Sequence, residues 1–384
     1  MALSALQAQG EIKSPDSRVD QNPQRGRALL KQIRRMKDEG GKNTWRMKSF
    51  QKFSAVVTVA GLISLCAGTY AQERKLEPLT ISYASVSGTR APLWIAKDLR
   101  LFEKYGLDGN LVYIASGVVS VNALLGGSVQ VIAASGSSAV GAAARGAPIA
   151  IIASLGPIAY KLIAHPSITS IQGLKGKVIG SSRAGAGSDY ALLRLLPKLG
   201  LQPGKDVYLI PTGLSESDRR LVIMLQGKID ATIATEDNLL QLELRGQKVS
   251  VLADFLDAGV YTTGSDIATS RQFLKERRRD LKAFIMALTE AISIGRNNKE
   301  QAFRVYRKYM KIDDPRLLES MHKNYLLRTI PPKPFPREEA LQNDIEDLSY
   351  TYPQLKGRRI EEFVDLSLVN ELESEGFFTR LHGR

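Results

Sequence analysis

Small and polar residues gather at five turns of the sequence, each directly before a helix pattern. One of them lies in GKVIGSSRAGAGSDYALLRLL, which runs from a short apolar strand through a loop into an amphipathic helix. A glycine-rich turn between a strand and a helix is a common anion site, because the first N–H groups of the helix are free to bind. The residues that offer this chemistry are Ser182, Arg183, Gly187, Ser188 and Asp189.

This loop matches neither of the two common nucleotide-binding glycine motifs. Gly180 and Gly185 have the GxxxxG spacing of a P-loop, but the lysine that must follow is missing. The dinucleotide pattern GxGxxG fails at Tyr190, where a small residue is required. The loop still has a helix N-terminus, two serines and an arginine. These features predict a turn that binds an anion. Asp189 either caps the helix or binds an amine of the ligand.

Two turns in the first third of the chain carry similar chemistry. In SVSGTRAP, hydroxyls and backbone N–H groups can hold an anion and the arginine can pair with it. An ordinary turn with a surface arginine is the alternative. In ASGSSAV, the serines either approach a ligand or only cap the alanine-rich helix that follows. The residues concerned are Ser87, Gly88, Thr89 and Arg90 in the first turn, and Ser135, Gly136, Ser137 and Ser138 in the second.

Two later turns and two tyrosines complete the set of candidate contacts. Thr212 and Gly213 lie in PTGLSESD, and Glu236 and Asp237 lie in ATEDN. The two acids either complement the dipole of the helix that they begin or face a cationic part of a ligand. Tyr160 and Tyr261 either supply aromatic walls to a site or pack within a hinge.

Strand and helix patterns alternate along the segment that positions these turns. The predicted strands are 79–84, 111–115, 129–134, 148–154, 177–181, 206–211, 229–235 and 248–254. The predicted helices are 91–106, 119–127, 137–146, 188–200, 216–228 and 236–246. The continuous apolar run 148–154 is typical of a parallel strand covered on both faces. From about residue 270 the chain reads as almost wholly helical, interrupted by the proline-rich stretch 330–336.

Two consecutive strand–helix runs, each too short for a large barrel, predict an α/β protein of two Rossmann-like lobes. We expect residues 76–160 and 262–384 to form the first lobe with a helical tail, and residues 161–261 the second. The chain would cross between the lobes near 158–169 and return near 254–270. Two extended crossings make a hinge, and the cleft between the lobes is the natural ligand site.

Residues 47–71 have the pattern of a secretory signal peptide. Lys48 and Lys52 precede an apolar run, and small residues place the cleavage before Gln72. An uncleaved membrane anchor is the alternative, although the apolar run is short for a bilayer core of about 30 Å. Residues 1–46 are polar and basic, so we expect either that translation starts at Met47 or that they form a cytoplasmic segment. The predicted location of the protein is the periplasm.

Charge and composition exclude several classes of function. The net charge is +14, but residues 1–71 hold 12 Lys/Arg against 5 Asp/Glu and so account for half of it. No basic block with interleaved aromatics follows, which argues against nucleic-acid binding. The one cysteine, Cys66, falls in the predicted signal, and the three histidines are far apart. We therefore expect no disulfide, no metal site, no catalytic thiol and no cofactor.

Several segments resemble one family of periplasmic solute-binding proteins. They are the helix ending in FEKYGL, the step ALLGGSVQVIAASGSS, the stretch GLKGK and the segment LLQGKIDATIA. Over about residues 76–300 the chain is similar to the nitrate/sulfonate/taurine type, also called the SsuA/THI5-like or NMT1-like group. The resemblance implies a type II periplasmic-binding fold in which the strand-to-helix turns face the cleft. It further implies a monomer that captures a small, anionic organic solute and delivers it to an ABC permease in the inner membrane.

Two other functions compete with this interpretation. One branch of the resembling group makes a thiamine pyrimidine and carries a cysteine-rich motif, which this chain lacks, so we expect no enzyme. A membrane-tethered sensor would need an uncleaved anchor and a cytoplasmic output domain. Residues 1–46 are too short and too polar to form one.

Overall fold

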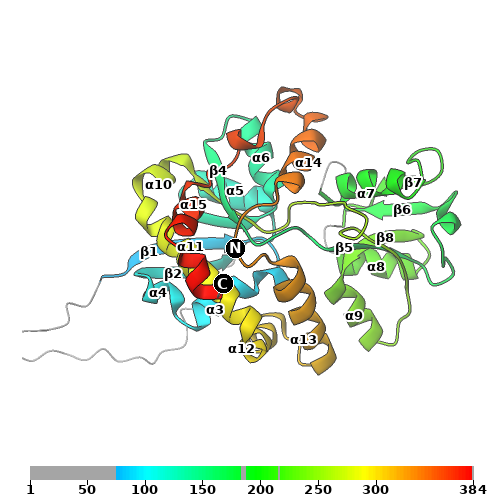
Figure 1. The fold of residues 1–384 in the computed structure, drawn as a ribbon. Coiled ribbons are helices and arrows are strands. Elements are labelled where there is room, and N and C mark those ends of the chain that lie inside the picture. The colour runs from blue at the N-terminus through cyan, green and yellow to red at the C-terminus, as the bar shows by residue number, and fades with distance from the viewer. Residues whose placement is uncertain (1–74, 183–186, 215–216, 383–384) are drawn as a thin grey trace, which may run out of the picture. The chain divides into compact units, whose positions relative to one another are not determined.

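A computed structural model describes residues 75–182, 187–214 and 217–382 of the chain (Figure 1). All of them belong to the second of two units, Glu73–Arg384. The predicted signal peptide, residues 1–46 and Arg183 lie outside the described residues. Within the described part, no helix is long and apolar enough to cross a membrane.

The first lobe is built on a five-stranded sheet of order β2-β1-β3-β10-β4. Its strands are β1 (Glu77–Tyr83), β2 (Leu107–Tyr113), β3 (Val131–Ala134), β4 (Ile149–Ser154) and β10 (Asp266–Ser270). The connections contain η1 (Gly88–Arg90), α3 (Ala91–Asp98), α4 (Leu101–Lys104), α5 (Gly117–Leu125) and α6 (Gly136–Ala144). Strand β1 is parallel to β2 and β3, whereas β10 is antiparallel to β3 and β4.

The second lobe repeats this topology in a sheet of order β7-β6-β8-β5-β9 (Figure 1, mostly green). Its strands are β5 (Tyr160–Ala164), β6 (Val178–Ser181), β7 (Tyr208–Pro211), β8 (Ala231–Thr235) and β9 (Ser250–Asp254). Its helices are η2 (Gln172–Leu174), α7 (Gly187–Lys198), α8 (Ser217–Leu225) and α9 (Glu236–Leu244). Strand β6 is parallel to β7 and β8, and β5 is antiparallel to β8 and β9. The prediction of two α/β lobes is confirmed, while their residue limits stay a prediction.

Two crossings join the lobes and pair with each other. The Ile158 N–H donates to the Thr262 carbonyl at 3.1 Å, and the Leu155 N–H donates to the Ser265 carbonyl at 2.8 Å. Gly264 allows this close approach, because a Cβ there would lie 2.5 Å from the Ile158 side chain. Each crossing continues into a strand, β5 or β10, that was predicted as part of a connection. Because these two strands run antiparallel, both sheets are mixed.

The apolar run 149–154 is buried for a different reason from the one that its sequence suggests. Strand β4 lies at the edge of its sheet and pairs only with β10, in the antiparallel sense. Its free edge is covered by the C-terminal segment: the Ile151 N–H donates to the Phe363 carbonyl at 2.9 Å, and the Asp365 N–H donates to Ile151 at 2.8 Å. The expectation of a parallel strand was therefore wrong, although all six residues of β4 are buried as expected.

The predicted helix 91–106 is interrupted, and the strand after it starts early. Arg100 takes a left-handed conformation (φ 55°) and separates α3 from α4. Strand β2 then begins at Leu107 instead of 111, although the sequence Asp-Gly-Asn suggests a turn. Gly109 fits inside this strand because the Phe102 ring packs on it, where a Cβ would lie 2.4 Å from the ring.

The C-terminal tail is helical, as predicted. Its α-helices are α10 (Arg271–Glu276), α11 (Arg278–Asn297), α12 (Lys299–Val305), α13 (Pro315–Met321), α14 (Glu338–Ser349), α15 (Ser367–Ser374) and α16 (Phe377–His382). It also contains two π-helices, η3 (Tyr306–Met310) and η4 (His322–Thr329), and two short 3₁₀ turns, η5 (Pro353–Leu355) and η6 (Ile360–Glu362).

The tail completes the core of the first lobe. The 20-residue helix α11 buries a wide apolar face, and its Phe284 ring stacks on Phe102 at 6.1 Å between centroids. Trp94 of α3 is fully buried and stacks on Tyr309 at 5.0 Å. Helix α13 begins where Asp314 accepts hydrogen bonds from the next N–H groups and Pro315 takes the first position. Burial of these rings makes the tail an integral part of the lobe.

Candidate functional site

A cavity of about 360 Å³ lies where both lobes and the tail meet. The first lobe contributes the turn after β1, and the second lobe contributes the start of α9. The crossings and the π-helix η4 complete the walls. The lining side chains used below are Ser85, Ser87, Thr89, Arg90, Ile158, Tyr160, Thr235, Asp237, Ser265 and Tyr325. We call this the arginine cavity.

Arg90 gives this cavity its chemistry. Its side chain is only 2% exposed. Nε and Nη2 donate to the Ser85 hydroxyl at 3.3 and 3.2 Å, and Nη2 also reaches the Gly264 carbonyl at 3.4 Å. Nη1 is buried, and no acceptor for it occurs among the described residues. Burial lowers the pKa of Arg90 to about 10, which keeps the guanidinium charged at neutral pH. A buried cation with a free donor in a cavity wall is suited to an anion.

A buried carboxylate accompanies this arginine. Asp266 at the start of β10 is 4% exposed and accepts the Gly136 N–H at 3.0 Å. Burial raises the pKa of Asp266 to about 6, against hydrogen bonds from Ser154 and Gly136 and the charge of Arg90, all of which lower it. Gly136 is required here because a Cβ would lie 2.8 Å from the Asp266 carboxylate. Gly136 therefore serves packing beside the cavity.

Tyr325 of the tail links the two lobes across this cavity. Its ring packs on Gly88 of the first lobe, where a Cβ would lie 2.1 Å from the ring. Its hydroxyl donates to Asp237 of the second lobe, which also accepts from Thr235 at 2.7 Å. Burial and the charge of Asp237 raise the pKa of Tyr325 well above its usual value. Because Arg90 is the cation among the side chains of this cavity, the end of the cavity suited to an anion is the Arg90 end.

A second cavity, of about 380 Å³, lies beside the first. It is lined by the turns after β3 and β6, the return crossing and helix α14, and Ile158 and Tyr160 line both cavities. The side chains at issue are Ser135, Ser137, Ser138, Ser182, Ser188, Thr262, Thr263 and Asp344. We call this the hydroxyl cavity.

Most hydroxyls of this second cavity are already paired. Ser182 and Ser188 share a hydrogen bond of 2.6 Å across the loop that begins α7. Ser135 bonds Ser137 at 2.7 Å and Thr263 at 2.9 Å. Thr263 in turn donates to Asp344, whose pKa burial raises well above its usual value. One hydroxyl that is not paired is that of Thr262, whose Oγ1 is buried without a hydrogen-bond partner among the described residues.

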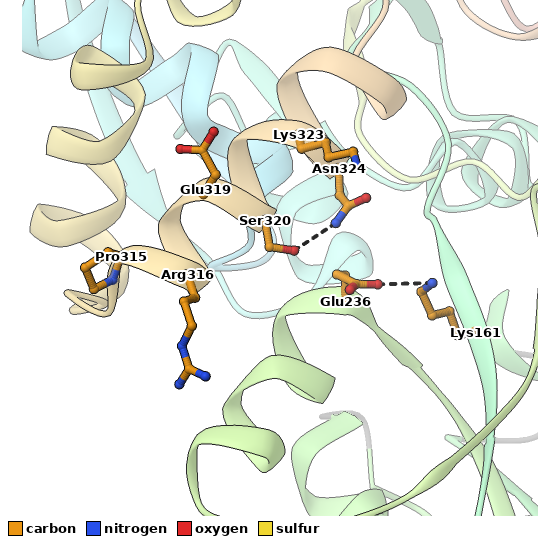
Figure 2. Close-up of a pocket in the computed structure, with 8 residues that line it drawn as sticks. All are labelled: Lys161, Glu236, Pro315, Arg316, Glu319, Ser320, Lys323 and Asn324. Atoms are coloured by element: carbon orange, nitrogen blue, oxygen red, sulfur yellow. Dashed lines mark hydrogen bonds and ion pairs between the residues drawn. The ribbon is translucent and has the colours of Figure 1, made fainter.

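A third cavity, of about 650 Å³, is an open one between the tail and the outer side of α9 (Figure 2). Figure 2 shows Arg316 and Ser320 of the tail on the side of Glu236 and Lys161 of the second lobe, whereas Glu319 points away from them. Lys161 lies 3.1 Å from Glu236, and Glu319 lies 3.3 Å from Lys299. Two further cations, Arg316 and Lys323, line this tail-side cavity.

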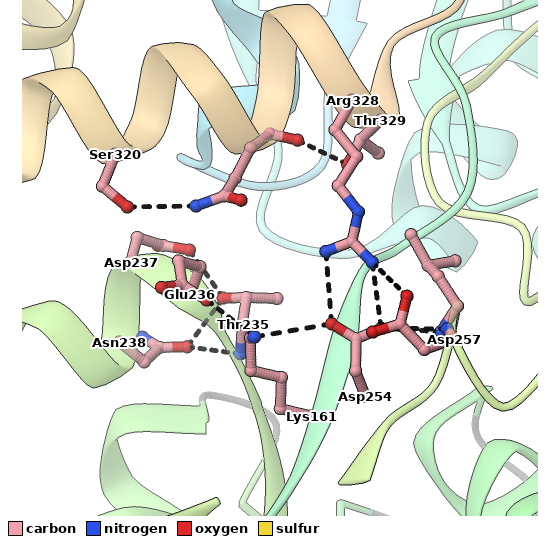
Figure 3. A network of polar contacts seen from close by, with 12 residues as sticks. Lys161, Thr235, Glu236, Asp237, Asn238, Asp254, Asp257, Ser320, Arg328 and Thr329 are labelled. Carbon is pink, nitrogen blue, oxygen red and sulfur yellow. Dashed lines mark hydrogen bonds and ion pairs between the residues drawn. The ribbon is translucent and has the colours of Figure 1, made fainter.

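A polar network continues from this cavity and joins the tail to the second lobe (Figure 3). Arg328 of η4 contacts Asp254 at 3.3 Å and Asp257 at 2.7 Å, and Lys161 contacts Asp254 at 3.4 Å. Burial alone would raise the pKa of Asp254, but the Asp257 N–H, Arg328 and Lys161 lower it below its usual value. Asp254 is thus ionised at neutral pH and holds the network together.

Comparison with known proteins places the chain in a family. Residues 88–302, more than half of the chain, match the family described as NMT1/THI5 like. The chain belongs to the NMT1/THI5-like family. No curated protein matches the sequence.

Solved structures support the fold of this NMT1/THI5-like protein. The periplasmic aliphatic sulphonate binding protein SsuA from Escherichia coli is 23% identical (TM-score 0.61), over 75% of this chain and 92% of that one. SsuA from Xanthomonas axonopodis pv. citri, bound to MOPS, is 21% identical (TM-score 0.60), over 76% and 99%. The nitrate-binding protein NrtA from Synechocystis PCC 6803 is 15% identical (TM-score 0.60), over 78% and 89%. The type II periplasmic-binding fold is thereby confirmed.

The structure brings many of the predicted contact residues of this NMT1/THI5-like protein to the two cavities. Ser87, Thr89 and Arg90 line the arginine cavity, and Ser135, Ser137, Ser182, Gly187 and Ser188 line the hydroxyl cavity. Tyr160 lines both. Gly88 and Gly136 instead make close packing contacts. That any of these residues touches a solute stays a prediction.

Other predicted residues lie elsewhere. Glu236 lines the tail-side cavity, and Asp189, Thr212 and Gly213 line neither the arginine nor the hydroxyl cavity. The Thr212 hydroxyl donates to the Ser181 carbonyl at 2.8 Å, so it stabilises the turn. Tyr261 packs under Arg337, with 3.5 Å from the guanidinium to the ring centre. We leave these residues out of the proposed site.

Sequence reasoning missed the contributions of the tail. Tyr325 and Asp344 line the cavities from η4 and α14. The spacing of apolar residues in the tail predicts its helices, but it does not indicate which of their side chains line the cleft between the lobes.

Proposed function

We propose that this protein captures a small anionic organic solute in the cleft and delivers it to an ABC importer from the periplasmic side of the membrane. The observation that carries the proposal is the buried, charged Arg90, which lines the arginine cavity and whose Nη1 has no acceptor among the described residues. The names of the structural neighbours, which bind sulfonates and nitrate, support the same class of ligand.

The arrangement of the cavity supports binding coupled to lobe closure. Arg90 comes from the first lobe, whereas Thr235 and Asp237 come from the second, so a solute between them contacts both. A ligand that contacts both lobes favours the closed state by its differential affinity. The paired crossings at Ile158 and Thr262 provide the hinge about which the lobes would move. The closed form is then the one that docks on the permease.

Isothermal titration of the purified protein with sulfonates, nitrate and aromatic carboxylates tests this function. We expect at least one anion to bind, to raise the melting temperature by mass action, and to be recovered chemically unchanged. Arg90→Met should weaken that binding by about tenfold or more, the loss expected for a charge-assisted hydrogen bond.

The matched control is Arg316→Met, which removes an exposed arginine of the tail-side cavity. It should leave the affinity unchanged. Equal weakening by both variants would show that a general electrostatic attraction, and not the arginine cavity, holds the anion. Turnover of the anion to a product would replace the binding function by an enzymatic one.

A further inference from the structure

We infer that the C-terminal tail is a clamp on the second lobe. The tail moves with the first lobe, holds the second lobe from both faces of its sheet, and so sets the fraction of the protein in the lobe arrangement that assembles the cleft. The inference rests on the proposed function only in that this arrangement is the one that binds solute.

Two parts of the tail are fixed to the first lobe by its hydrophobic core. Tyr325 and Leu326 of η4 are 2% and 0% exposed and belong to the same apolar cluster as residues of β1 and α3. Leu341 and Ile345 of α14 belong to a second cluster, which contains residues of β3 and β4. Exposing these side chains would cost more than breaking any one polar contact, so η4 and α14 move with the first lobe.

The π-helix η4 holds the second lobe on the side of α9. The Tyr325 hydroxyl donates to Asp237 at the start of α9. One turn later, Arg328 lies 3.3 Å from Asp254, the last residue of β9 (Figure 3). Leu240 of α9 is half-buried against the core cluster of the first lobe. Polar and apolar contacts thus join the tail to this side of the second lobe.

Helix α14 and the segment after it hold the second lobe on the side of α7. Arg194 of α7 donates to both oxygens of the Asp347 carboxylate, at 3.0 and 2.6 Å, and to the Asn343 carbonyl at 3.0 Å. Tyr190, one turn earlier on α7, shares a hydrogen bond of 3.2 Å with Thr351 and packs against the α14 cluster. Residues four apart lie on one face of a helix, so this face of α7 is the one that the tail contacts.

The two sets of contacts lie on opposite faces of the second sheet. Leu195 of α7 belongs to the apolar cluster that contains Leu162 of β5, whereas Leu242 of α9 belongs to the cluster that contains Ile163. Successive residues of a strand point to opposite faces of its sheet. The tail therefore holds the second lobe from both faces, and a movement of this lobe away from the first separates the partners on both.

The clamp acts on a solute only through the positions of the lobes. Neither Arg194 nor Arg328 lines the arginine cavity or the hydroxyl cavity. When only a fraction of a protein has the arrangement that binds, the apparent affinity falls by that fraction for every ligand alike. Loosening the clamp should therefore weaken the binding of chemically different anions by one common factor.

Calorimetric titration of Arg194→Met and Arg328→Met with nitrate and with an alkanesulfonate tests this expectation. We expect the affinity for both anions to fall by the same factor, about three- to tenfold for Arg194→Met. The more exposed contact of Arg328 should give about two- to fivefold. The matched control is Arg278→Met, which removes two hydrogen bonds of 2.8 Å, to Ser367 and Glu371, within the tail. It should leave both affinities unchanged.

A distance measurement without any added anion tests the clamp independently of binding. Spin labels at Asp108→Cys in the first lobe and Lys205→Cys in the second, both exposed positions, report the separation of the lobes in a Cys66→Ser background. We expect pulsed electron resonance to show a broader distribution with longer distances for Arg194→Met and Arg328→Met. Arg278→Met should give the wild-type distribution.

The outcomes separate the clamp from the function on which it rests. Equal distance distributions for the wild type and both clamp variants would overturn the inference. So would a rise in affinity, which would mean that the tail opposes assembly of the cleft, or a different loss for each anion, which would mean a direct effect on the solute. If the wild-type protein binds no anion, the proposed function fails, and the distance measurement still decides whether the tail is a clamp.

Discussion

The pH dependence of stability should reveal the buried carboxylate next to Arg90. Asp266 is 4% exposed, and burial raises its pKa from 3.8 to about 6. The folded state therefore holds a proton on this group in a range where the unfolded chain has already lost it. The stabilising contribution is fully present below about pH 4 and is lost as the pH rises through about 6.

The perturbation that isolates this effect is Asp266→Asn. Asparagine keeps an oxygen that can accept the Gly136 N–H, but it never ionises. A shift of about two pKa units corresponds to about 3 kcal/mol at 1.36 kcal/mol per unit. Relative to the variant, the wild-type protein should lose about that much free energy of unfolding between about pH 4 and pH 7. The charge of Asp266 also raises the pKa of Asp344, which adds to the effect in the same direction.

Urea unfolding at several pH values between about 4 and 7.5 measures this difference. Titrating groups that do not interact with Asp266 are common to both proteins and cancel when the two free energies are subtracted at each pH. Asp313→Asn, which changes an 86% exposed acid, is the matched control and should show no such trend. A wild-type-minus-Asp266→Asn difference that stays constant over this range would refute the raised pKa.

Two further predictions concern packing and the contact between the lobes. Gly88→Ala should lower the free energy of unfolding by about 1–3 kcal/mol, because its Cβ would lie 2.1 Å from the Tyr325 ring. Gly187→Ala, with no atom within 4 Å of its Cβ, is the control in the same thermal or urea unfolding assay. Arg194→Met should cost about 1.5–3 kcal/mol in that assay, because Arg194 of α7 makes two hydrogen bonds, of 3.0 and 2.6 Å, to the Asp347 carboxylate of α14. A loss no larger than that of Arg316→Met would show that this contact contributes little.

The fold could be predicted from the sequence because the strand–helix alternation is strong and local. The two strands that were missed, β5 and β10, come directly after the crossings and run antiparallel to their neighbours. Nothing in five apolar or mixed residues says that each strand pairs in the middle of the sheet of the lobe that it enters, because that pairing depends on contacts distant in the sequence. The position of β2 was missed for a similar reason, since Gly109 reads as a turn until the Phe102 ring is seen to pack on it.

The candidate site residues could be predicted from the sequence only where the residues of a single turn are themselves suited to binding a ligand. Arg90 and the serines of the β3 and β6 turns were found because small and polar residues before a helix are a local signal. Gly88 and Gly136 share that signal, and the structure shows that they also accommodate Tyr325 and Asp266. The tail residues Tyr325 and Asp344 reach the cavities from distant parts of the chain, so no local pattern marks them.

The repeated topology explains why the cleft has two cavities of similar size and different chemistry. By strand order, β1 of the first sheet corresponds to β6 of the second, and β3 corresponds to β8. The arginine cavity combines the turn after β1 with the turn after β8, and the hydroxyl cavity combines the turn after β3 with the turn after β6. Each cavity thus combines a turn that follows β1 or β6 with a turn that follows β3 or β8 of the opposite lobe. This combination is expected when two equivalent lobes face each other about an approximate twofold axis.

A symmetric pair of turns would hold a solute equally well in either direction. Here the symmetry is broken by the residues themselves: the β1 turn ends in Arg90, whereas the corresponding β6 turn places Ser182 and Ser188 in a closed hydrogen bond. The two cavities therefore differ in their cations: Arg90 lines the first, whereas Arg145 and Arg220, which donate to Tyr352 and to the Leu214 carbonyl, line the second.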